Sequence, residues 1–142
     1  MKIKKGIIAL FSRNGGTQII IRGLDHDDEY KAINFRKSIR AAADDIADSE
    51  EEFIKQCNLE IADNRKLVGA DDDIKKFLKF REKLYEEEAE IICKTISFES
   101  WCALKKDNLP LAIPDVEEAL EGLFWLAPDT EKDNANPKIS TI

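Results

Sequence analysis

The sequence predicts a mainly α-helical protein with an antiparallel pair of long helices, a short extended segment and a small C-terminal helix. Three observations support this class. A stretch of about thirty residues carries an uninterrupted heptad pattern, of the kind that keeps one side of a helix against a partner. A second amphipathic stretch follows it after a connection containing Asn and Gly. Only two short segments, 17–22 and 90–98, are rich enough in β-branched residues to be extended.

The long helix is predicted over residues 27–57, which contain neither Gly nor Pro. Its seam positions are spaced alternately by three and four residues, as in a coiled coil; they are Ala32, Phe35, Ile39, Ala42, Ile46, Ser49 and Phe53. Acidic residues fill the first turn, where the helix dipole favours them, and Asp27 is the expected cap. A seam of this length needs a second helix against it, from the same chain or from another copy.

A second helix is expected to begin at Asp71, after a connection over residues 58–70 that reverses the chain. Its apolar face consists of Ile74, Phe77, Leu78, Leu84 and Tyr85, and Lys and Glu side chains fill the opposite face. Two amphipathic helices joined by a turn pack most simply in antiparallel fashion. This packing would fill the seam within one chain.

Two segments at the start of the chain allow alternative structures. The spacing of apolar residues over 3–11 favours a short helix, but a hairpin that joins 7–11 to 17–22 around Gly15 and Gly16 is also compatible with the sequence. The extended segment 90–98 is expected to pair with 17–22 if the helix forms.

The C-terminal part is predicted to contain a helical turn over 99–104, a loop, and a third helix over 116–126 that ends before Pro128. We expect residues 1–127 to form a single helical domain and residues 128–142 to form a flexible C-terminal tail. No apolar run is long enough to span a membrane, and the N-terminal one is too short for a signal peptide. We therefore expect a cytoplasmic protein.

The charge is unevenly distributed along the chain. The net charge is −7, although residues 1–40 contain nine basic and four acidic side chains. Arg22, Arg36, Lys37 and Arg40 form a candidate basic patch, through which an oligomeric regulator would contact nucleic acid. Because the whole chain is acidic, nucleic acid is an unlikely partner.

No residue pattern predicts a catalytic, cofactor-binding or metal site. His26 and Asp28 would be the residues of a metal-dependent hydrolase, but acidic residues around a helix start are more often there for the helix dipole. Cys57, Cys93 and Cys102 lack the spacing of metal ligands and are expected to be buried free thiols. We therefore expect a non-enzymatic protein without a cofactor.

Aromatic residues near the C-terminus are candidates for a partner surface, formed by Trp101, Phe124 and Trp125. The third helix is apolar over more than half of its circumference, and Trp is frequent where proteins bind one another. A place in the core is the more common role of such residues. The surface would serve self-association or a protein partner.

The order of the elements resembles that of small, uncharacterised phage and prophage proteins of the tail and structural gene region. The similarity lies in the long charged helix over 30–57, the second helix that ends in Glu86-Glu87-Glu88, the extended Thr95-Ile96-Ser97-Phe98 and the small helix over 116–126. No catalytic residue carries over from such proteins. The resemblance implies a helical interaction or assembly protein that is an accessory of a phage particle.

Overall fold

The computed structural model describes residues 1–124, with side chains up to residue 120. In chain order the elements, in which η denotes a 3-10 helix, are β1 (Lys2–Lys4), α1 (Lys5–Arg13), η1 (Gly16–Gln18), α2 (His26–Gln56), β2 (Glu60–Ile61), β3 (Leu67–Val68), α3 (Asp71–Glu86), β4 (Glu88–Glu90), α4 (Phe98–Asp107), η2 (Leu109–Ala112) and α5 (Pro114–Phe124). The mainly helical class is confirmed. The predicted domain limit at 127 and the tail 128–142 lie outside the described residues.

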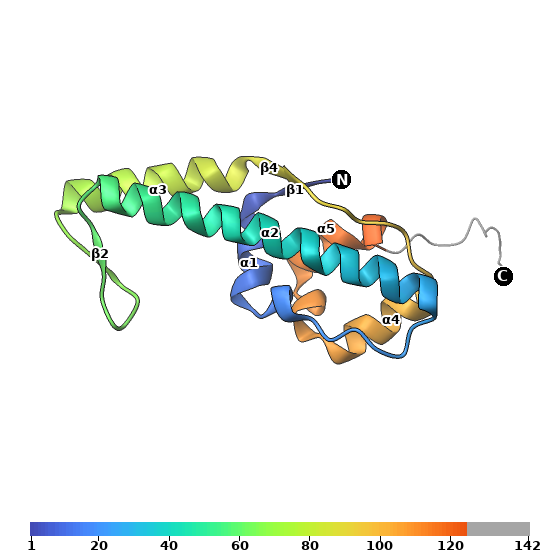
Figure 1. Cartoon of the computed structure of the whole chain (residues 1–142). Helices are drawn as coiled ribbons and strands as arrows, with labels where there is room; N and C mark the ends of the chain where they lie inside the picture. Colours follow the sequence, from blue (N-terminus) through green and yellow to red (C-terminus); the bar gives the residue numbers. More distant parts are fainter. Residues whose placement is uncertain (125–142) are drawn as a thin grey trace.

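Helix α2 runs along the whole length of the described structure, and the other elements lie against its two halves (Figure 1). Around its N-terminal half, α1, α4, α5, η1 and η2 form a part that we call the base. The C-terminal half of α2, the β2–β3 hairpin and α3 project from the base and form a part that we call the arm. Within residues 1–124, no helix combines the length and the apolar character needed to cross a membrane.

The hydrophobic core lies mainly in the base. The predicted seam of α2 is its buried face, since Ala32, Phe35 and Ile39 are each at most 2% exposed. Phe11 of α1 lies against Phe35, with the ring centroids 6.4 Å apart. The C-terminal elements contribute Trp101, Leu104, Leu111, Val116 and Leu120 to the same cluster. Several short elements, and not one second helix, therefore cover this half of the seam.

In the arm, α3 covers the C-terminal half of the seam. The rings of Phe53 and Phe80 are stacked, with centroids 4.1 Å apart and planes at 4°. Phe77 lies 6.3 Å from Phe53, and the Tyr85 hydroxyl donates a hydrogen bond of 3.1 Å to Glu50. The arm is thus held by aromatic packing along the two helices, while much of its surface is charged.

The short strands correct one prediction. Strand β4 pairs with β1 in antiparallel register, Lys2 opposite Glu90 and Lys4 opposite Glu88. Residues 17–22 lie in no strand, so the predicted pairing of 90–98 with 17–22 does not form. Opposite charges across neighbouring strands stabilise such a pair. The ammonium group of Met1 also contacts the Glu90 carboxylate. Complementary charge therefore selects the N-terminus as the partner.

The N-terminal segment forms a helix, as the apolar spacing favours, and the hairpin alternative is wrong. Gly15 follows α1 with a φ of 87°, in the left-handed region that favours glycine. Gly16 packs on the Phe11 ring so closely that a Cβ atom would overlap it. Beyond this turn, Ile20 exchanges two hydrogen bonds with the Asn108 side chain, its N–H donating at 2.6 Å and its carbonyl accepting at 2.8 Å. The Asn108 side-chain amide thus makes the hydrogen bonds to residue 20 that were predicted to come from a neighbouring strand.

Candidate functional site

The aromatic residues predicted to form a partner surface do not gather on one. Trp101 is 1% exposed and belongs to the base core, which corrects its predicted place at a surface. The physical reason is that α4 turns Trp101 and Leu104 towards α2, while the Lys105 ammonium lies 5.7 Å from the Trp101 ring centroid. The Phe124 side chain and the whole of Trp125 lie outside the described residues.

Three residues of the predicted basic patch hold the segment that follows η1. The Arg36 guanidinium donates to the Ile19 carbonyl at 2.9 Å, and Arg40 donates to the Thr17 carbonyl at 2.7 Å. Arg22 pairs with Asp107 of α4 at 3.1 Å. Lys37 is exposed on α2. These arginines fasten one chain segment to the base, Arg36 and Arg40 through backbone carbonyls and Arg22 through an ion pair.

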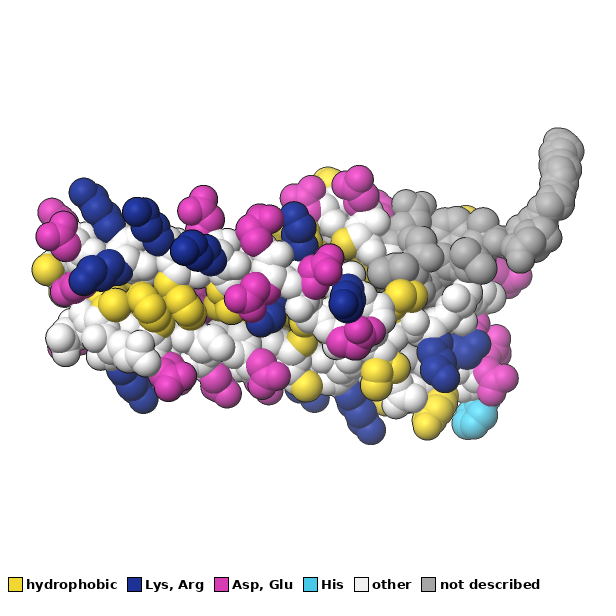
Figure 2. All heavy atoms as spheres, turned by 90° about the horizontal axis from the view of Figure 1, so that it is seen from above, with side chains coloured by type: hydrophobic (Ala, Val, Ile, Leu, Met, Phe, Trp, Pro, Cys, Tyr) yellow, Lys and Arg dark blue, Asp and Glu magenta, His cyan; other side chains and the backbone are white. Residues whose placement is uncertain are grey.

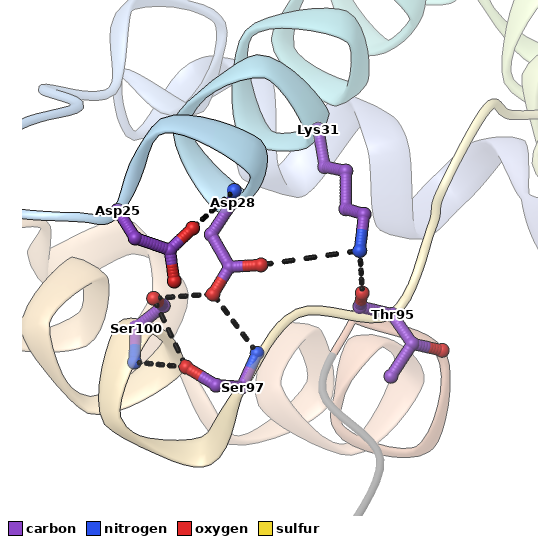
Figure 3. Close-up of polar contacts among 6 residues, drawn as sticks. All are labelled: Asp25, Asp28, Lys31, Thr95, Ser97 and Ser100. Atoms are coloured by element: carbon purple, nitrogen blue, oxygen red, sulfur yellow. Dashed lines mark hydrogen bonds and ion pairs between the residues drawn. The ribbon is translucent and has the colours of Figure 1, made fainter.

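The start of α2 contains a buried carboxylate that fastens α4 to it (Figure 3). The cap of α2 is Asp25, whose side chain accepts the Asp28 N–H at 2.9 Å; it is not Asp27 as predicted. Asp28 is 5% exposed and accepts the Ser100 hydroxyl at 2.7 Å and the Ser97 N–H at 3.2 Å. Ser97 in turn caps α4 by accepting the Ser100 N–H. One carboxylate thereby joins two helix starts.

The electrostatic balance at this carboxylate keeps it ionised. Burial, the largest influence, raises the pKa of Asp28, but the hydrogen bonds from Ser100 and Ser97 and the charge of Lys31 together lower it below its ordinary value. Lys31 lies 3.9 Å from the carboxylate and donates to the Thr95 carbonyl. A carboxylate with a lowered pKa and occupied oxygens is a weak base. Its geometry is that of a structural fastening, not of the proposed metal ligand.

The described part of the chain contains no cluster of three or more His, Cys, Asp or Glu side chains that could hold a metal ion. The cysteines are free, as expected, but their exposure differs. Cys102 is exposed, whereas Cys57 and Cys93 are half-buried. The expectation that all three are buried is therefore wrong for Cys102, which lies on the outer side of α4.

The thiols are expected to differ sharply in reactivity. Burial raises the pKa of Cys93 to about 11, and only a thiolate reacts readily with an alkylating reagent. At pH 8 we expect iodoacetamide to modify Cys102 at least about ten times faster than Cys93, as measured by peptide mass spectrometry of timed samples. The same reaction in urea is the control, since unfolding should equalise the rates. Equal rates in the folded protein would contradict the burial of Cys93.

A cleft of about 460 Å³ opens where α1, α2, α3 and the β2–β3 hairpin meet. Most of its lining is apolar, contributed by Ala9, Ala43, Ile46, Ala47, Ile54, Ile61, Leu67 and Phe77. Ile61 and Leu67 are paired across the hairpin and form one wall. In Figure 1 the hairpin and α1 lie on the same side of α2. Residues of both line the cleft.

Three arginines from three elements line the same cleft: Arg13 ends α1, Arg65 lies in the hairpin turn, and Arg81 belongs to α3. None of them is in an ion pair with another residue of the described chain. Burial, and then the neighbouring Glu50 carboxylate, raise the pKa of Tyr85, which Arg81 and Arg13 lower. Both guanidinium charges therefore act on the end of the cleft where Tyr85 and Glu50 lie.

Comparisons with protein families, with curated proteins and with solved structures found no match. The cleft is the feature that sequence reasoning missed. Its three arginines are separated by long stretches of chain, and each alone looks like an ordinary surface charge. Only the packing of α1, α2 and α3 against one another brings them to one place.

Proposed function

We propose that the protein is a non-enzymatic helical interaction protein that binds a protein partner, or a second copy of itself, through its arm. The observation that carries this proposal is the exposure of large apolar side chains there: Ile61 is 59%, Val68 54% and Leu78 45% exposed. Covering such side chains removes apolar surface from water and favours association. Figure 2 shows hydrophobic side chains in a line along the arm, with Lys and Arg side chains along one side of it.

Several polar residues of the described chain have structural tasks. Asp28 joins α2 to α4, and Arg36 and Arg40 hold the segment after η1. The cleft and the apolar side chains of the arm have no such internal task. The resemblance to phage and prophage proteins supplies the setting of the proposal, in which the protein is an accessory or assembly factor of a phage particle and acts in the cytoplasm.

Site-specific photo-crosslinking in cells that produce the protein tests this proposal. A photoreactive amino acid is placed at Leu78 or Val68 in the arm, and at Lys106, which is exposed on α4 in the base, as the control. We expect adducts from the arm positions and far fewer from position 106. An adduct of twice 16.2 kDa would identify a second copy, and any other mass a different partner. The absence of adducts from both arm positions would overturn the proposal.

A further inference from the structure

We infer that the cleft binds an acidic peptide segment of a partner protein, whose carboxylates pair with Arg13, Arg65 and Arg81 while an apolar side chain enters the cleft. The inference rests on the proposed function and adds to it the location of the partner and its chemistry. Three observations carry it, namely the unpaired charges, the backbone of the hairpin turn and the apolar lining.

The charges around the cleft are opposite to those of the chain as a whole. The protein has 29 acidic and 22 basic residues, yet the cleft is lined by three arginines and by Glu50 as its one acidic residue. Some other basic side chains, such as Lys4, Lys5 and Lys105, are paired with glutamates. Arginine is weakly hydrated and binds a carboxylate through two parallel hydrogen bonds. Arg81 lies over the Phe77 ring, 5.3 Å from its centroid, but none of the three arginines is in an ion pair within the described chain. Their gathering beside apolar surface therefore favours a ligand that supplies carboxylates.

The backbone conformation of Arg65 points to a functional role for its side chain. Arg65 has a φ of 64°, in the left-handed region. Its N–H donates to the Ala62 carbonyl at 2.8 Å and so closes the turn. This conformation costs a residue with a Cβ atom roughly 1 kcal/mol, and Gly or Asn would fit it better. Strained residues of this kind gather at functional sites. The arginine at this position contributes a positive charge to the mouth of the cleft.

The apolar lining favours a peptide over a nucleic acid or a free anion. Nucleic acids and phosphate would leave Ile54 and Ile61 uncovered, because surfaces that bind nucleic acids are predominantly polar. A peptide can supply an apolar side chain and carboxylates together. The β2–β3 hairpin, which forms one wall of the cleft, would be stabilised by a bound ligand. Two-stranded hairpins are marginally stable by themselves, and β2 and β3 have only two residues each. A bound peptide would hold this hairpin against α3.

Selection from a displayed library of random twelve-residue peptides, on the immobilised full-length protein, tests the inference. We expect the recovered peptides to combine several Asp or Glu residues with a large apolar residue. For the best synthetic peptide, measured by fluorescence anisotropy, Arg13→Glu/Arg65→Glu/Arg81→Glu should weaken binding by at least about 30-fold. Lys37→Glu/Lys94→Glu/Lys106→Glu is the matched control, since it changes the net charge equally at exposed positions outside the cleft. It should change affinity by less than about threefold.

A second variant separates binding from folding. Arg65→Asn keeps a residue that tolerates the left-handed turn but removes the guanidinium. We expect about fivefold weaker peptide binding with an unfolding temperature that is unchanged or higher. Unaltered binding in this variant would count against the role of Arg65.

Several outcomes would overturn the inference. These are a library that yields no peptides or non-acidic ones, acidic peptides that bind the triple glutamate variant as well as the wild type, and a dimer in light scattering that this variant dissociates, which would assign the cleft to a second copy. Crosslinks from Leu78 without acidic peptides would leave the proposed function standing and remove this inference alone.

Discussion

Replacing Trp101 by Ala is expected to lower the free energy of unfolding by about 4 kcal/mol, because truncation of a large buried aromatic side chain typically costs 3–5 kcal/mol. Trp101 is 1% exposed and packs in the same cluster as Leu104 and Leu111. Domains are stable by only about 5–15 kcal/mol in total. The variant should therefore unfold at a much lower urea concentration than the wild type.

The unfolding of the Trp101 variant is best followed by far-ultraviolet circular dichroism, since the substitution removes one of two tryptophans and alters the fluorescence. Tyr30→Ala is the matched control, because Tyr30 is an aromatic residue that is 64% exposed. It should change the free energy of unfolding by less than about 0.5 kcal/mol. A Trp101→Ala protein with an unchanged urea midpoint would show that this side chain does not support the base.

Asp28→Ala is expected to lower the free energy of unfolding by about 2 kcal/mol at pH 7, since it removes the acceptor of a buried hydroxyl and of a backbone N–H. Ser100 is 5% exposed and donates to Asp28 at 2.7 Å. The loss should appear mainly at the junction of α2 and α4. Hydrogen exchange should therefore speed up in the first turn of α4, after Ser97, more than in α3.

The effect of Asp28→Ala should depend on pH in a defined direction. The pKa of Asp28 is below its ordinary value of 3.8 in the folded protein, so the ionised carboxylate stabilises the fold above that value. This contribution is lost as the pH falls from about 4 through the lower, folded-state pKa. The stability difference between the wild type and Asp28→Ala should thus shrink in acid. Asp44→Ala, which changes an exposed residue of α2, is the control, and a difference that stays constant down to pH 3 would contradict the lowered pKa.

The sequence was informative where apolar residues recur at helical spacing. The spacing of apolar residues is a property of neighbouring turns, so the buried face of α2 could be predicted down to Phe35 and Ile39. The strand that pairs with β4 could not be predicted, because Lys2 and Glu90 are almost ninety positions apart in the sequence. Helix α4 was underestimated as a single turn, although Ser97 three residues before Ser100 is a recognisable cap, because the β-branched run before it favoured an extended structure.

The candidate site was beyond prediction for a related reason. Arg65 and Arg81 stand among other charged residues of the sequence, Arg13 stands alone in an uncharged stretch, and no spacing connects the three. Their meeting depends on where α1 and α3 pack along α2. Trp101 was offered as a surface residue because its helix could not be oriented from the sequence, and the same packing places it in the core.

The arm is one uninterrupted run of chain, whereas the base is assembled from segments on both sides of it. During translation the arm can therefore fold as soon as α3 has left the ribosome, from contacts between near neighbours in the chain. The base cannot close until α4 and η2 have been made, since Ile20 must meet Asn108, 88 residues later. Until then the nascent chain exposes Phe35 and Ile39 without their cover. Folding should accordingly proceed from the middle of the sequence outward, with closure of the base as the slow step.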